Sequence, residues 1–229
     1  MTKTIAITGC SRGIGKETVR YLLKEGHEVI ALSRNCDNLK ELQDEYSKLI
    51  SLELDFSNQF GRDLLKDFLV SNNKTIDGII HNAGLLLNKP FAETTLEDMI
   101  SVYSINVFSV SELTRLLLPF FNPGAHVVAI SSMGGIQGSM KFPGLAAYSS
   151  SKGALITLME LLAEEFKDKN LSFNTLALGA VQTEMLKEAF PGYQASVTAE
   201  KMGAYVGQFA LSGQELYNGK VLQVSNSTP

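Results

Sequence analysis

Short runs of β-branched and apolar residues recur along the chain and alternate with longer segments whose apolar residues repeat at helical spacing. The expected strands are Thr4 to Thr8, Val29 to Leu32, Ile50 to Leu54, Gly78 to His81, His126 to Ile130, Phe173 to Leu178 and Lys220 to Val224. The expected helices are Ile14 to Lys24, Leu39 to Ser47, Phe60 to Leu69, Leu96 to Leu118 and Ala146 to Lys167. This alternation predicts an α/β fold, a doubly wound parallel sheet of seven strands with helices on both faces.

No repeat, low-complexity tract or Pro/Gly-rich linker divides the chain, so we expect one domain over residues 1–229. Its 45% hydrophobic residues are enough for one sizeable core. In doubly wound sheets, ligands bind beyond the carboxyl ends of the strands, so the residues that follow each strand are the first candidates for a site.

Charge and cysteine content narrow the choice of partners and compartment. The formal charge of -4 lacks the basic excess that attracts nucleic acid, and nucleic acid is not expected as a partner. The two cysteines, Cys10 and Cys36, give no support for a secreted disulfide framework. No apolar run approaches the roughly 18 residues that span a bilayer, so we expect a cytoplasmic protein without a membrane partner.

A glycine-rich loop follows the first expected strand and leads into the first helix. Glycines allow a tight turn and let a pyrophosphate approach the N–H groups of a helix N-terminus. The alternative is an ordinary strand-to-helix turn, but the position after the first strand favours a nucleotide site. The candidate cofactor-binding residues here are Gly9, Ser11, Arg12, Gly13, Ile14 and Gly15.

The end of the second strand bears on the choice of cofactor. An NAD enzyme would carry an acid here for the ribose hydroxyls, yet the sequence reads Ser33-Arg34. Arg34, together with Arg12, is suited to a 2'-phosphate, so NADP(H) is expected and NAD(H) is less favoured. Two solvated surface arginines are the alternative.

A second constellation could perform acid–base chemistry. Tyr148 and Lys152 stand four positions apart on an expected helix, on the same face. A nearby ammonium lowers the pKa of a phenol, which can then exchange a proton with a substrate oxygen, although such a pair alone is common. Ser132 follows the fifth strand, and Asn106 lies within a helical pattern. We predict no metal site.

Together these motifs resemble the short-chain dehydrogenase/reductase family in its short, single-domain form, with its Rossmann fold, and the resemblance runs from the first strand to the last. It implies that Tyr148 is the proton donor or acceptor, and that Lys152 lowers the pKa of Tyr148 and holds the nicotinamide ribose. It further implies that Ser132 orients the carbonyl and that Asn106 holds a water in a proton relay.

The resemblance also implies further cofactor contacts. Asp55 would contact the adenine, and Asn82, with Ala83 and Gly84, would support the cofactor between strands. Val181 and Thr183 would meet the nicotinamide carboxamide through a backbone group and a hydroxyl, respectively. From the residues alone, Asp55 could instead cap the next helix. Asn82-Ala83-Gly84 could likewise be only a turn.

The substrate side departs from the family pattern. The stretch from Ser132 to Tyr148 is longer than is common, which predicts an extended loop over Gly138 to Pro143, and the expected lid, about 184–197, is short. The loop from Met140 to Leu145 and the lid are mostly apolar, which favours a hydrophobic or aromatic ketone. The lid residues expected to line the pocket are Met185, Leu186, Phe190 and Tyr193.

The leading hypothesis is an NADP(H)-dependent oxidoreductase that acts on a small-molecule carbonyl or alcohol. The alternatives are an NADP(H)-binding regulatory or sensor protein on the same fold, and an epimerase or dehydratase of a nucleotide sugar. The complete set of catalytic candidates opposes the first alternative, and the short chain opposes the second. Apolar residues around the helix after Tyr148 and the helix near Val110 predict a homodimer or homotetramer.

Overall fold

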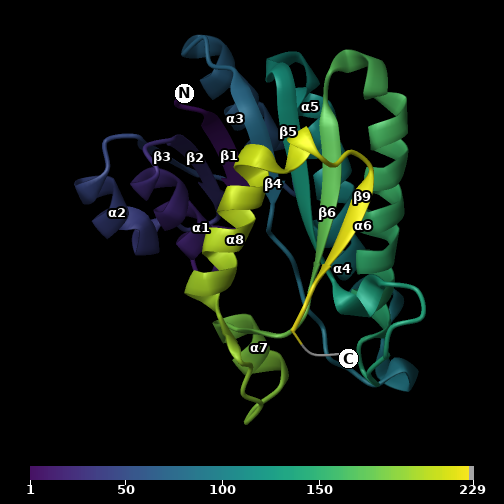
Figure 1. The fold of residues 1–229 in the computed structure, drawn as a ribbon. Helices are drawn as coiled ribbons and strands as arrows, with labels where there is room; N and C mark the ends of the chain where they lie inside the picture. The colour runs from purple at the N-terminus through teal and green to yellow at the C-terminus, as the bar shows by residue number, and fades with distance from the viewer. Residues whose placement is uncertain (227–229) are drawn as a thin grey trace.

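The seven main strands form one parallel sheet, as predicted, and their order is β3-β2-β1-β4-β5-β6-β9 (Figure 1). This computed structural model describes residues 1–226, and residues 227–229 of the predicted domain lie outside the described residues. The strands are β1 (Thr4–Thr8), β2 (Glu28–Ser33), β3 (Leu49–Glu53), β4 (Ile76–His81), β5 (Phe121–Ser132), β6 (Ser172–Leu178) and β9 (Lys220–Val224). The order reverses between β1 and β4, where such sheets open a ligand crevice.

Helices cover both faces of the sheet, because alternate strand residues point to opposite sides. On one face, Ile5 and Ile7 pack with α1 (Gly13–Lys24), α2 (Lys40–Glu45) and α8 (Ala199–Ser212). On the other, Ala6 packs with α3 (Gln59–Ser71), α5 (Ser109–Leu117) and α6 (Ala146–Glu165). Among residues 1–226, no helix combines the length and apolar character that crossing a bilayer requires.

The expected helix Leu96 to Leu118 is interrupted. The structure divides it into α4 (Leu96–Tyr103), a π-helical turn (Ser104–Phe108) and α5. A π turn contains an extra residue, which rotates the side chains that follow relative to those before it. The expected helix Leu39 to Ser47 is shorter than predicted, because only a 3₁₀ turn (Asp37–Leu39) and α2 form there.

Helix α8 was not predicted from the sequence. Gly203 and Gly207 lower its intrinsic helix propensity, but they allow close packing on α1. A Cβ at Gly203 would lie 2.7 Å from the Cβ of Glu17, and one at Gly207 would lie 2.5 Å from the ring of Tyr21. The crowded contact with α1 therefore explains why a glycine-containing segment forms a helix here.

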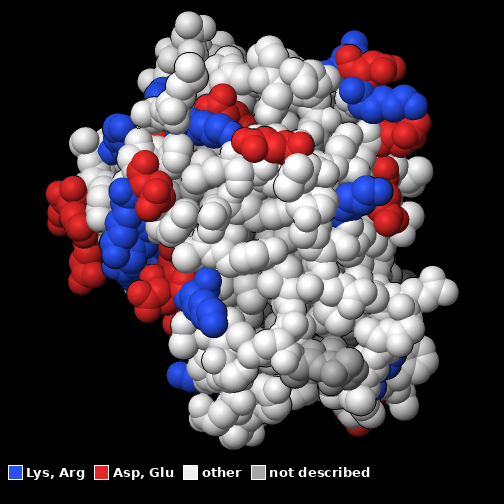
Figure 2. Space-filling view, in the orientation of Figure 1, with Lys and Arg blue, Asp and Glu red and all other residues white. Residues whose placement is uncertain are grey.

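The expected lid contains a short helix and part of a small second sheet. Helix α7 (Glu184–Ala189) follows β7 (Val181–Gln182), and β7 pairs in parallel with β8 (Val197–Thr198). In Figure 1, α7 lies at the lower end of the molecule, apart from the main sheet. Figure 2 shows both charge signs mixed over α1 and α2 and near the C-terminal end of α6, whereas the lower part of this face is largely uncharged.

Candidate active site

The glycines of the loop after β1 are required by backbone packing. Gly9 has a φ of +70°, and a Cβ there would lie 2.7 Å from the Cα of Ala83. A Cβ at Gly15 would lie 2.2 Å from the carbonyl oxygen of Gly9. Gly13 has a φ of +56°, in the left-handed region that glycine adopts without strain. The loop therefore packs closely against the residues that follow β4, and no side chain of these glycines keeps a ligand away from the loop backbone.

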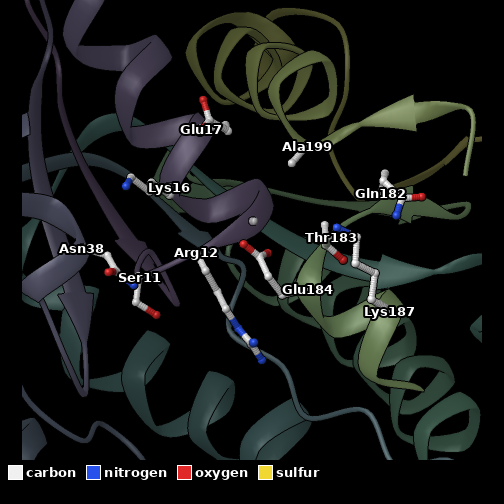
Figure 3. Close-up of a pocket in the computed structure, with 11 residues that line it drawn as sticks. Ser11, Arg12, Lys16, Glu17, Asn38, Gln182, Thr183, Glu184, Lys187 and Ala199 are labelled. Atoms are coloured by element: carbon white, nitrogen blue, oxygen red, sulfur yellow. The ribbon is translucent and has the colours of Figure 1, made fainter. Parts of the chain in front are cut away.

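The first turn of α1 is suited to an anion. Its N-cap residue, Arg12, makes no side-chain capping bond, and the turn contains no acid. The N–H groups of a helix N-terminus together carry partial positive charge. A pocket of about 390 Å³ adjoins the loop and contains Ser11, Arg12 and Gly13 on one side and Thr183 on the other (Figure 3). The N–H groups of this turn therefore fit the phosphates of a dinucleotide, although Glu17 and Glu184 also line the pocket.

Arg12 is engaged by the lid. Its guanidinium forms a bidentate ion pair with the carboxylate of Glu188 in α7, including a bond of 3.0 Å from Nη2 to Oε2. Glu184 adds a further negative charge near Arg12, and in Figure 3 these two side chains lie near each other beside the pocket. The sequence did not indicate this pairing, because the acids stand more than 170 positions away.

Asn82 joins β4 to β1 at the point where the strand order reverses. Its Nδ2 donates to the carbonyl oxygens of Thr8, at 3.1 Å, and Gly9, at 2.8 Å. The backbone N–H groups of Asn82 and Ala83 donate to the hydroxyl of Thr8, at 3.1 and 3.0 Å. This segment is therefore more than a turn. Thr8 was not singled out from the sequence, since threonine is ordinary in a strand.

Asp55 does not cap the next helix. Its Oδ1 accepts hydrogen bonds from the N–H and hydroxyl of Ser57, at 3.0 and 2.6 Å, while Asn58 is the N-cap of α3. The Ser57 hydroxyl is the main cause that lowers the pKa of Asp55, and the charge of Arg34 adds to it. Arg34 is exposed, directly after the buried Ser33.

Tyr148 lies beside Ser132, the last residue of β5. Burial raises the pKa of the Tyr148 phenol, and the hydrogen bond with the Ser132 side chain acts in the opposite direction. The loss of hydration is the larger of the two effects, so the pKa of Tyr148 is raised rather than lowered. The Nζ of Lys152 lies over the Tyr148 ring, 5.8 Å from its centroid.

Lys152 is buried, with only 4% of its surface exposed. Its Nζ donates to the carbonyl oxygen of Ile130 at 2.7 Å. Burial lowers the pKa of this ammonium to about 8. A Cβ on Gly84 would lie 3.4 Å from Lys152 Nζ and 3.4 Å from Asn106 Oδ1, so Gly84 lies between the two polar side chains.

Asn106 lies in the π turn and is fully buried. Its Oδ1 accepts the N–H of Leu85 at 2.8 Å, and its Nδ2 donates to the carbonyl of Leu85 at 3.0 Å. Nδ2 also donates to the hydroxyl of Ser151 at 2.9 Å. Asn106 thus connects the segment after β4 with the helix that presents Tyr148 and Lys152. Leu85 and Ser151 were not predicted as its partners.

Val181 and Thr183 lie just before the lid. Val181 is buried in β7, and the Thr183 hydroxyl caps α7 by accepting the N–H of Leu186 at 3.2 Å. Near the lid, a second pocket of about 200 Å³ is formed by Leu86, Asn88, Met185, Glu188 and Ala189. Of the predicted substrate-pocket residues, only Met185 lines it. Met140, Phe142 and Tyr193 are instead exposed by about half.

Comparison with known proteins places the chain in one family of dehydrogenases. Residues 3–194 match the family described as short chain dehydrogenase. The 7alpha-hydroxysteroid dehydrogenase of Escherichia coli (strain K12) is 30% identical over 191 residues, which cover 81% of this chain and 73% of that protein.

Solved structures show the same fold. A 4-hydroxyisoleucine dehydrogenase complexed with NADH has a TM-score of 0.88 at 24% identity, covering 99% of this chain and 98% of that chain. A 3-ketoacyl-(acyl-carrier-protein) reductase from Brucella melitensis complexed with NADH has a TM-score of 0.84 at 21% identity, covering 97% of this chain and 96% of that chain. At these identities the likeness establishes the fold.

Proposed function

Because the chain belongs to the short-chain dehydrogenase/reductase family of oxidoreductases, which bind nicotinamide cofactors, we propose that it transfers hydride between NADP(H) and a carbonyl or secondary alcohol. The observation that carries this proposal is the cluster of Ser132, Tyr148 and Lys152 beyond the end of β5. The phosphate-loop pocket opens on the same carboxyl edge of the sheet.

In the proposed mechanism, Tyr148 is the acid–base group. Its raised pKa keeps the phenol protonated near neutrality, ready to donate to a carbonyl oxygen that Ser132 also contacts. When bound, the nicotinamide supplies or accepts the hydride. The phenolate that remains after donation is stabilised by the Lys152 ammonium, which is largely protonated below its pKa of about 8. Asn106 holds the segment after β4 beside this pair.

The remaining candidate residues belong to the cofactor side of the proposal. The loop from Gly9 to Gly15 would hold the phosphates, Asp55 the adenine, and Val181 and Thr183 the carboxamide. We propose NADP(H) rather than NAD(H), because Ser33 offers no acid for the ribose and Arg34 is exposed beside it. Glu188, which is paired with Arg12, competes with a phosphate for the Arg12 guanidinium.

The remainder of the proposal concerns the substrate and the assembly. We take an apolar ketone or alcohol as the substrate class, because Leu86 and Met185 line the smaller pocket beside α7, with residues 184–197 as its lid. Apolar side chains that remain exposed on α4, the π turn and α6 support a homodimer or homotetramer. They are Leu96, Ile100, Phe108 and Leu161. Light scattering at micromolar concentration tests the assembly, and a monomer would contradict it.

The decisive experiment measures NADPH and NADH oxidation with a panel of ketones and aldehydes, for the wild type and Tyr148→Phe. We expect higher kcat/KM with NADPH, and a loss of turnover of about 10²- to 10⁴-fold in Tyr148→Phe at unchanged NADPH affinity. Unchanged turnover in the variant would assign proton transfer to another group. NADPH binding without turnover of any carbonyl in the wild type would favour the sensor alternative.

A further inference from the structure

Three segments that are distant in the sequence meet at Asn88. This residue follows β4, six positions after Asn82. Its Nδ2 donates to the carbonyl oxygen of Ala189, the last residue of α7, at 2.9 Å. The last carbonyls of a helix have no partner within the helix. The C-terminal end of the lid helix is therefore capped by a side chain from another segment.

The extended loop before Tyr148 lies against the same residue. The N–H of Lys89 donates to the carbonyl oxygen of Gly144 at 2.9 Å. Gly144 has a φ of +85°, and a Cβ there would lie 2.2 Å from Asn88 Oδ1. Only glycine permits this approach without strain. Asn88 and Lys89 thus contact both the lid and the loop that leads to the catalytic tyrosine.

Helix α4 anchors this junction. The Nζ of Lys89 forms an ion pair with Asp98 at 2.6 Å, and Asp98 belongs to the capping box that Thr95 begins. At the other end of the segment, Leu85 is held by Asn106 through two hydrogen bonds. The short segment 85–90 is therefore held in place on both sides of Asn88. Asn88 can thus position the end of α7 relative to the rest of the site.

The pocket of about 200 Å³ lies at this junction, and Asn88 shares its wall with Leu86, Met185, Glu188 and Ala189. We propose that Asn88 is a positioning residue for the substrate. By holding the end of α7, Asn88 sets the separation between α7 and the segment after β4. This separation determines how much space the pocket offers to the part of the substrate that does not react. This inference rests on the proposed function, because it takes the pocket beside α7 as the substrate site.

The test compares Asn88 with an asparagine that makes the same kind of bond elsewhere. Asn72 is also exposed, and its Nδ2 donates to the carbonyl oxygen of Phe68 at the end of α3, at 2.8 Å. Asn88→Ala and Asn72→Ala each remove one amide donor from a helix end. Asn88→Asp and Asn72→Asp keep the shape but replace the donor with a carboxylate, which repels the carbonyl oxygen.

Hydrogen exchange of the peptide that spans α7 provides a readout independent of turnover. One neutral hydrogen bond corresponds to a change of about 2- to 10-fold in an equilibrium. We expect exchange in α7 to accelerate by about that factor in both Asn88 variants. Neither Asn72 variant should change it. Unchanged exchange in the Asn88 variants would overturn the proposal.

Steady-state kinetics supply the second readout. We expect the KM for the carbonyl substrate to rise about 2- to 10-fold in the Asn88 variants, with kcat and NADPH affinity retained. Faster exchange in α7 without a change in KM would overturn the positioning role. If the wild type reduces no carbonyl, the proposed function fails, whereas the exchange measurement still decides whether Asn88 holds α7.

Discussion

Around the phosphate loop, glycines pack against backbone atoms, whereas near the substrate pocket the lid is attached through side chains. Gly9 and Gly15 leave no room for a methyl group beside Ala83 and the loop itself. The lid is joined to the rest of the site by the amide of Asn88 and by the exposed ion pair between Arg12 and Glu188. Exposed ion pairs contribute only about 0–1 kcal/mol. The cofactor side therefore tolerates few substitutions, while the substrate side can vary.

The largest effect is expected where the two sides meet. Lys152→Ala removes the ammonium that stabilises the Tyr148 phenolate and the bond to the carbonyl of Ile130. We expect turnover to fall at least as far as in Tyr148→Phe, by about 10²- to 10⁴-fold. NADPH affinity, measured by fluorescence titration, should weaken as well, because Lys152 is also proposed to hold the ribose. If Lys152→Ala binds NADPH as tightly as Tyr148→Phe does, Lys152 does not contact the cofactor.

Gly15→Ala tests the rigidity of the cofactor side. Its methyl group would lie 2.2 Å from the carbonyl oxygen of Gly9 and 2.5 Å from Nδ2 of Asn82, so the loop must shift. Overpacking of this kind costs about 1–3 kcal/mol. Because the strained atoms belong to the loop that would hold the phosphates, we expect this cost to appear as a loss of NADPH affinity of about 5- to 150-fold. Gly138→Ala is the control on the substrate side, where a Cβ meets no atom within 4 Å.

In Gly138→Ala we expect a loss of thermal stability, because Gly138 has a φ of +80°, at which alanine is strained. NADPH affinity should stay at the wild-type value. Equal losses of affinity in the two glycine variants would show that the two sides do not differ in rigidity.

Arg34→Asp tests cofactor choice without disturbing the loop. The exposed guanidinium is replaced by a carboxylate that repels a 2'-phosphate and can accept ribose hydroxyls. We expect the ratio of kcat/KM for NADPH to that for NADH to fall about 10-fold or more. A ratio that does not move would exclude Arg34 from the phosphate contact. Lys48→Asp, a charge reversal at an exposed lysine whose Nζ donates to the carbonyl of Gly26, serves as the control.

The smallest effect concerns acid stability. His81 ends β4, and burial lowers the pKa of its imidazole to about 3. The unfolded chain takes up a proton near pH 6.5, while the folded chain stays neutral. Stability is therefore complete above pH 6.5 and declines as pH falls towards 3, by about 1–2 kcal/mol at pH 5 for this group.

His81→Gln removes this contribution, since glutamine does not titrate and can still bond the hydroxyl of Thr114, which lies 2.9 Å from His81 Nε2. We expect the difference in Tm between pH 7 and pH 5 to be smaller in the variant than in the wild type. A parallel loss of Tm in both proteins would mean that His81 is protonated in the folded state. His126, whose pKa is lowered to about 4 by burial, remains in both.

The parts of the structure that the sequence predicted are those with local signals. The seven strands, the glycine loop and the Tyr148 to Lys152 pair follow from periodicity and spacing within a few residues. Helix α8 was missed because the packing of Gly203 and Gly207 against α1 outweighs their poor propensity. The Arg12 to Glu188 pair and the Asn88 cap depend on tertiary proximity, which no local pattern encodes.

The chemistry of the site was also only partly predictable. Spacing placed Tyr148 and Lys152 on one helix face, but it did not show that Lys152 would donate to Ile130 or that burial would raise the pKa of Tyr148. Both effects arise from how deeply the helix is buried against β5. The pocket residues Leu86 and Asn88 had no signal of their own, because the segment after β4 forms neither helix nor strand.

The π turn at Ser104–Phe108 also affects which insertions and deletions the chain can accept. Successive residues of a helix are rotated by about 100° around its axis. The extra residue of the π turn changes this rotation at the place where the side chain of Asn106 contacts Leu85 and Ser151. Deleting one residue there would straighten α4 and α5 into a continuous helix but rotate the asparagine away from both partners. The position of a single amide therefore restricts length changes at this point.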